Sequence, residues 1–156
     1  MTQTMTPTAA APGETIVEQI SIAAPAERVF AALVDPQQRT QWWGDAGAFR
    51  TTHMESDLRV GGQWLQSGTG RDGRPFTIRG EYRIIERPRV LAFTWLPSWQ
   101  GSAEVSLVRF DLEERDGVTT VRLTHSALTP QARQIHRGWP QILGWLKAYV
   151  TPAGAP

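Results

Sequence analysis

Two side chains of this sequence, His125 and Tyr82, combine acid–base chemistry with a place on the apolar face of a predicted strand. His125 follows Val121 and Leu123 in an alternating pattern, so its imidazole is predicted to point into the protein. Tyr82 holds a similar place in the alternating run 76–84. Two interpretations of His125 remain open: a polar anchor or proton carrier facing a cavity, and a neutral core histidine bonded to a backbone carbonyl or a hydroxyl.

The other polar candidates carry less information. The strand facing of His53 is undecided, and His136 is expected to be exposed, early in the last helix or in its lead-in. Glu55 and Asp57 are conceivable proton carriers, although Asp57 beside Gly61-Gly62 is more typical of a turn residue that accepts backbone amides.

Several kinds of reactive site are disfavoured by the pattern. No two of the three histidines have the i, i+4 spacing of helical zinc sites, and the lack of cysteine removes thiolate ligands and nucleophiles. Ser126 falls on the strand face opposite to His125, and no Gly-x-Ser-x-Gly elbow occurs. The glycine pairs lack the lysine and following helix of a phosphate-binding loop. We therefore expect neither a metal nor a cofactor.

The elements that position these residues follow from hydrophobic periodicity. Residues 14–22 alternate as a half-buried strand, and Pro25 opens a helix that Asp35-Pro36 ends. A second short helical turn is expected to end near Gly44. Residues 49–126 then show the pattern of six antiparallel strands, separated by turn signals. These turn signals are Gly61-Gly62, Asp72-Gly73, Arg87-Pro88, Pro97-Ser98 and Asp116-Gly117.

The closing segment, residues 129–150, has helical rather than strand periodicity. Its apolar stripe consists of Ile135, Trp139, Ile142, Leu143, Leu146 and Val150. Because Pro140 cannot donate its amide, we expect either a kink there or a helix that begins near Gly138-Trp139 after a separate turn. Strand, helices, strands and a long final helix together predict an α+β domain.

Length and composition limit the remaining possibilities. The 156 residues suffice for one domain, expected over residues 14–150, with a disordered tail over residues 1–13 and a loose end over residues 151–156. A net charge of +1 gives no reason to expect nucleic acid as a partner. No apolar run is long enough for a membrane span, and the first residues show neither the basic flank nor the apolar stretch of a secretory signal, so we expect neither. With cysteine absent, a cytoplasmic location is the simplest expectation.

Several short motifs in this order resemble the helix-grip fold of the START-like (SRPBCC) superfamily, and within it the family of the activator of Hsp90 ATPase homologue 1-like proteins. The motifs are APAERVF at 24–30, WWG at 42–44, DLRVGGQW at 57–64, GEY at 80–82, RPRVLAFTW at 87–95, LTHS at 123–126, and GW at 138–139 with Ile142 and Leu143. The resemblance implies a curved antiparallel sheet of about seven strands that grips a long C-terminal helix, with a cavity between them.

The resemblance also implies where a ligand would lie. Seven tryptophans are many for this length, and most of them would gather between sheet and helix. The predicted ligand-binding residues are Trp43, Trp64, Tyr82, Phe93, Trp95, His125, Trp139, Ile142, Leu143 and Leu146. A tightly packed core remains the alternative, because aromatic residues at strand or helix spacing usually serve packing.

Three functions are consistent with these features. The first is non-enzymatic binding of a small hydrophobic or aromatic molecule in the cavity. The second is a cyclase- or hydrolase-type enzyme in which His125 and Tyr82 carry protons. The third is a co-chaperone-like module that acts on an Hsp90-type ATPase. A homodimer is possible for a sheet with free edges.

Overall fold

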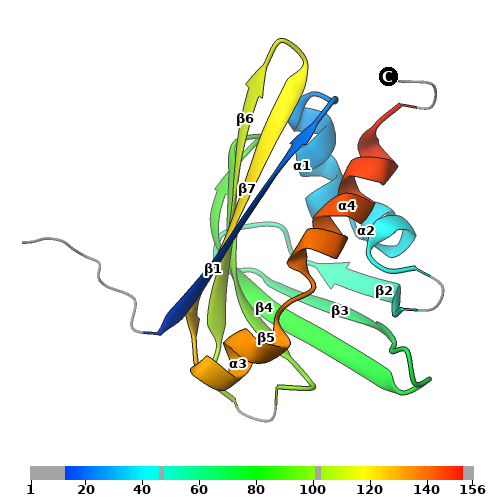
Figure 1. Cartoon of the computed structure of the whole chain (residues 1–156), viewed down its shortest axis with the longest axis vertical. Helices are drawn as coiled ribbons and strands as arrows, with labels where there is room; N and C mark the ends of the chain where they lie inside the picture. The colour runs from blue at the N-terminus through cyan, green and yellow to red at the C-terminus, as the bar shows by residue number, and fades with distance from the viewer. Residues whose placement is uncertain (1–12, 46–47, 101–102, 153–156) are drawn as a thin grey trace, which may run out of the picture.

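The alternating apolar segments form seven strands of a single curved antiparallel sheet. The computed structural model describes residues 13–45, 48–100 and 103–152. The predicted α+β helix-grip class is confirmed, with all described helices on the concave side or at one end of the sheet (Figure 1). The expected tail over residues 1–13 lies outside the described residues, apart from Gly13, and so does most of the expected loose C-terminal end.

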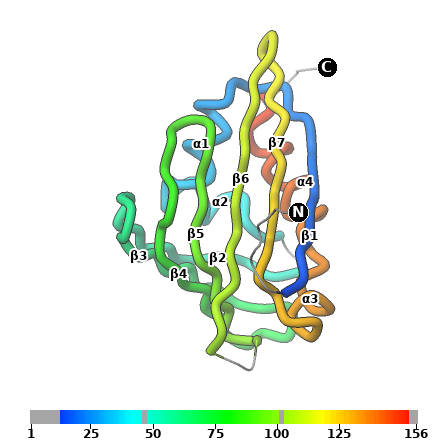
Figure 2. Tube along the Cα trace, turned by 90° about the vertical axis from the view of Figure 1, so that its left-hand side faces the viewer, coloured from blue at the N-terminus to red at the C-terminus, as the bar shows by residue number. Residues whose placement is uncertain are grey.

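The later strands form an antiparallel meander, and the first strand of the chain pairs with the last one. The strand order in the sheet is β1-β7-β6-β5-β4-β3-β2, so β1 pairs with the last strand and β2 is the other edge (Figure 2). The strands are β1 Glu14–Ile22, β2 Arg50–Ser56, β3 Gln63–Thr69, β4 Pro75–Glu86, β5 Val90–Pro97, β6 Ser106–Arg115 and β7 Val118–Leu128. Each of the expected turn signals lies at a strand end or between consecutive strands. The β6–β7 turn uses Asp116 and Gly117 at φ 55° and 80°, which a tight hairpin requires.

Two short helices follow β1 and cover part of the concave side. Helix α1, Ala26–Val34, begins after Pro25 and buries Val29, Phe30 and Leu33. Helix α2, Pro36–Trp42, is capped by the Asp35 carboxylate, which accepts a hydrogen bond from the amide of Gln37 at 3.1 Å. Both helices agree with the sequence prediction.

The C-terminal segment is two helices rather than one long helix. Helix α3, Pro130–Ile135, ends at His136, and helix α4, Trp139–Val150, starts after Gly138. A continuous helix would need the amide of residue 140 to donate to the carbonyl of residue 136, which proline cannot do. The alternative with a separate turn is therefore correct. The break also rotates the two parts, so Ile135 is half exposed although the predicted stripe placed it on the buried side.

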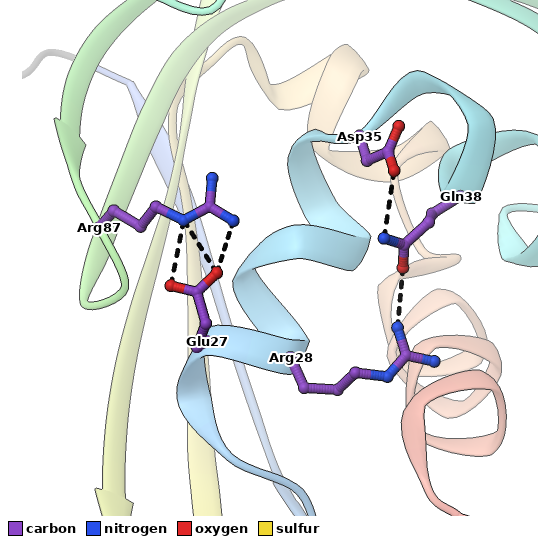
Figure 3. A network of polar contacts seen from close by, with 5 residues as sticks. All are labelled: Glu27, Arg28, Asp35, Gln38 and Arg87. Carbon is purple, nitrogen blue, oxygen red and sulfur yellow. Dashed lines mark hydrogen bonds and ion pairs between the residues drawn. The ribbon is translucent and has the colours of Figure 1, made fainter.

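Polar contacts fix the helices to each other and to the sheet (Figure 3). Glu27 on α1 pairs with Arg87 at the β4–β5 turn. On the other side of α1, Arg28 donates to the Gln38 side chain at 2.8 Å, and Gln38 in turn donates to Asp35 at 3.2 Å. The helix positions are thus set by side chains as well as by apolar packing.

The hydrophobic core lies between the concave face and helices α1, α2 and α4. Its large buried side chains come from every layer, including Phe30, Phe93, Phe110, Leu123 and Leu146. Among the described residues, no helix has the length and apolar character needed to cross a membrane.

Candidate functional site: an aromatic pocket beside a histidine pair

Four indole rings from different elements form one continuous cluster in the core. Trp95 on β5 lies 6.1 Å from Trp43, 6.1 Å from Trp64 and 5.2 Å from Trp139, measured between ring centroids. Such separations are those of favourable aromatic pairs. The gathering of tryptophans that the family resemblance implies is therefore present, and most of these rings pack on one another.

His125 lies inside this cluster, completely buried. The indole N–H of Trp139 donates to Nδ1 of His125 at 3.0 Å. Because Trp139 can only donate, the proton of the neutral imidazole must be on Nε2, which lies 2.7 Å from the hydroxyl of Ser106. Both ring nitrogens are thus engaged inside the protein, which is the arrangement of a satisfied core histidine.

His136 is buried beside His125, and the expectation that it is exposed is wrong. The two imidazole centroids are 5.0 Å apart. Nδ1 of His136 donates to the carbonyl of Ala132 at 2.7 Å, and Nε2 accepts the indole N–H of Trp95 at 3.0 Å. The helix break at residues 136–138 turns this side chain inward.

The environment keeps both histidines neutral. Burial lowers the pKa of His125 to about 3, and the neighbouring His136 adds to that effect. Burial also lowers the pKa of His136, partly opposed by its bond to Ala132. Protonation of Nδ1 of His125 or of Nε2 of His136 would break the hydrogen bond that this nitrogen accepts from a tryptophan N–H. The pair is therefore built to stay uncharged and hydrogen-bonded.

Tyr82 belongs to a different polar group. Its hydroxyl lies 2.6 Å from that of Ser56, and burial raises the pKa of Tyr82. Close by, Arg39 is almost fully buried and bonds to the carbonyl of Leu33 at 2.7 Å and to the side chain of Gln66. Tyr82 and His125 therefore lie in separate hydrogen-bonded groups.

Arg39 is a buried cation that the sequence analysis missed. Its guanidinium carbon lies 4.2 Å from the ring centroid of Trp43, a cation–π distance. Burial lowers the pKa of Arg39 to about 10. Within the described chain its Nε has no hydrogen-bond partner, nor has the indole nitrogen of Trp64. No feature of the local sequence distinguishes Arg39 from an exposed helical arginine.

A pocket of about 530 Å³ opens beside the aromatic cluster, between β4, β5 and the α3–α4 junction. Of the ten predicted ligand-binding residues, four line it: Trp43, Trp95, Trp139 and Ile142. The other six are buried behind this wall or elsewhere in the core: Trp64, Tyr82, Phe93, His125, Leu143 and Leu146. The remaining apolar lining comes mainly from Phe49, Phe76, Ile78, Trp99 and Ile135.

The polar part of the lining is concentrated at the mouth. Among the lining residues that the structure describes, His136 is the one buried polar residue, while Arg71, Asp72, Arg74 and Ser98 are exposed. His53, whose facing was undecided, is exposed on β2 and contacts Glu55 at 2.8 Å, away from this pocket. In the described ranges, no group of three histidine or acidic side chains is placed to hold a metal ion.

Known structures share this fold. Protein CV1439 from Chromobacterium violaceum superposes with a TM-score of 0.76 at 22% identity, covering 88% of this chain and 97% of that chain. Protein Ms6760 from Mycobacterium smegmatis gives 0.77 at 20% identity, over 94% and 96% of the two chains. PFC0360w, an HSP90 activator from Plasmodium falciparum, gives 0.66 at 21% identity, over 87% and 95%. These likenesses concern the fold.

A comparison with curated proteins finds no match to this chain. The sequence profile of one protein family, described as activator of Hsp90 ATPase homolog 1-like protein, matches residues 23–151. This range begins before α1 and includes all later strands and helices, so it contains every residue of the pocket wall and of the histidine pair. The chain belongs to the family of activator of Hsp90 ATPase homolog 1-like proteins.

Proposed function

We propose that this protein binds a small apolar or aromatic molecule in the pocket at the α3–α4 junction, and that it does so without catalysing a reaction. The observation that carries this proposal is the lining itself, in which aromatic rings from several segments surround about 530 Å³. Pockets of this size and apolar character are typical of small-molecule sites.

The state of the polar groups supports binding over catalysis. A proton carrier needs a nitrogen or oxygen that can reach the substrate. At His136 both ring nitrogens are bonded within the protein, and His125 is separated from the pocket by Trp95 and Trp139, which line it. Tyr82 is hydrogen-bonded to Ser56 and does not line the pocket. The two residues favoured for an enzyme thus do not meet at the cavity.

A matched pair of glycine substitutions tests the proposal. Gly138 lines the pocket, and Gly144 lies further along α4 outside it; a Cβ atom at either position would meet no atom within 4 Å. Neutral aromatic alcohols of graded size would be titrated by calorimetry and by tryptophan fluorescence. Gly138→Phe is expected to weaken binding by at least about tenfold by occupying the pocket, whereas Gly144→Phe keeps it. No saturable binding of any compound, or equal loss in both variants, would contradict the proposal.

A second candidate function is stimulation of an Hsp90-type ATPase. It is supported by the family of this chain and by the similarity of its fold to the HSP90 activator from Plasmodium falciparum. The test is the ATPase rate of the Hsp90 homologue from the same organism, measured with and without excess protein. An unchanged rate together with no detectable complex would rule out this function.

A further inference from the structure

The mouth of the pocket carries charge that the interior lacks. Arg71, Asp72 and Arg74, on the turn between β3 and β4, all line it and are exposed. The Asp72 carboxylate accepts the backbone amide of Arg74 at 3.0 Å and lies 3.6 Å from the Arg74 side chain. Within the described residues Arg71 forms no ion pair, so the mouth keeps one positive charge that is not neutralised locally.

The interior of the pocket offers a ligand little polar recognition. The imidazole of His136 is saturated by Trp95 and Ala132, and the indole N–H of Trp139 is used by His125. A charged group placed deep in the pocket would lose its hydration without gaining these partners, which is costly. A charged group that stays at the mouth keeps contact with water.

We propose that the ligand is an amphiphilic acid, whose apolar or aromatic body fills the pocket while its anionic group remains at the mouth beside Arg71 and Arg74. This inference rests on the proposed binding function and names the chemical class of the ligand. Arg71 supplies the uncompensated charge, and Arg74 shares its guanidinium between Asp72 and the anion. Arginine suits this role because its planar donor array matches a carboxylate or sulfonate.

The arginines at the mouth are exposed to solvent, and this exposure limits how strongly the pocket can prefer an anionic ligand. Ion pairs at a solvated protein surface are weak, and salt screens them. We therefore expect an anionic ligand to bind about three- to tenfold more tightly than a neutral ligand of the same shape at low salt, and this preference to shrink in concentrated salt.

Three compounds that share one ring system test the inference: naphthoate, naphthylmethanol and naphthylmethylamine. Their affinities would be measured by isothermal titration calorimetry at low and high ionic strength. The expected order is carboxylate, then alcohol, then amine. In the double variant Arg71→Gln/Arg74→Gln the charge left on this turn is Asp72, so the order should reverse in favour of the amine. The double variant Arg79→Gln/Arg122→Gln is the matched control, because both arginines are exposed outside the pocket, on β4 and β7, and their loss changes the net charge by the same amount.

The outcomes separate this inference from the proposed function. If none of the three compounds binds at a site blocked by Gly138→Phe, the binding function itself fails. If all three bind there with equal affinity, the pocket function stands and recognition of an acid is overturned. A carboxylate preference that persists unchanged in Arg71→Gln/Arg74→Gln, or that disappears equally in Arg79→Gln/Arg122→Gln, also overturns the role of Arg71 and Arg74.

Discussion

Acidification should destabilise the fold through His125 before most carboxylates become protonated. In the unfolded chain a histidine titrates near its ordinary pKa of 6.5, whereas burial lowers the pKa of folded His125 to about 3. Between these values the unfolded state binds the extra proton and the folded state does not. The free energy of unfolding must therefore fall as the pH falls from about 6.5 towards about 3.

The magnitude can be worked out at about pH 5, roughly 1.5 units below the unfolded pKa, where His125 alone should lower the free energy of unfolding by about 2 kcal/mol. His136, whose pKa is also lowered, changes stability in the same direction. A chain of this size loses a few degrees of Tm per kcal/mol, so Tm should drop by about 4–8 °C. Glu27, whose pKa is lowered by its hydrogen bond to Arg87, contributes stability that is lost mainly at lower pH, below its ordinary value of 4.5.

Urea unfolding followed by circular dichroism at about pH 7.5 and about pH 5 measures the effect. His125→Gln, which cannot be protonated, should reduce the pH dependence. Imidazole NMR titration of the unaltered protein gives an independent test. The reasoning is refuted if His125 titrates near its ordinary value of 6.5, or if the free energy of unfolding is the same at both pH values.

Four substitutions test other parts of the structure, each by urea unfolding. Gly80→Ala should destabilise the fold by more than about 3 kcal/mol, because the added Cβ would lie 1.8 Å from a backbone oxygen of β5. Gly144→Ala, with open space around its Cβ, should instead stabilise the fold by up to about 1 kcal/mol. Similar effects at both sites would contradict this geometry. Trp139→Phe should cost about 1–3 kcal/mol beyond its small change in volume, since His125 then loses its donor; a neutral result would mean that this bond contributes nothing. Arg39→Lys should cost about 1–3 kcal/mol because an ammonium cannot replace the stacked guanidinium, and unchanged stability would show that the guanidinium geometry is unimportant.

The sheet was predictable because each strand repeats a simple pattern. Phe76, Ile78 and Tyr82 alternate with exposed residues on β4, and all three are buried as the period of two requires. The β6–β7 turn was equally clear, since Asp116-Gly117 offers two residues that tolerate positive φ. Local sequence decides these features, so local reasoning finds them.

The C-terminal segment shows where periodicity misleads. The apolar stripe predicted over residues 129–150 puts Ile135 on the buried side, and His136 is expected to be exposed, early in the last helix or in its lead-in. The break before Pro140 changes the phase of the first part relative to the second, so Ile135 is half exposed and His136 is buried. The proline pointed to the break, but the direction of the rotated side chains depends on tertiary packing.

Arg39 escaped prediction for a related reason. In sequence it is a polar residue of a short helix that follows Asp35, where an exposed side chain is the ordinary expectation. Its compensation comes instead from a carbonyl at the C-terminal end of α1, an amide on β3 and the face of Trp43. A helix C-terminus stabilises a cation, but the sequence does not show that this end meets Arg39.

The position of the pocket follows from the same helix break. Under α4 the space is filled, because Trp43, Trp95 and Trp139 pack on one another and Leu146 is completely buried. Open volume is found where α3 stops and α4 has not yet begun, next to Gly138, which has no side chain to place there. The hollow thus arises from an interruption of the gripped helix, and a substitution that restored a large side chain at residue 138 should close it without disturbing the aromatic cluster behind.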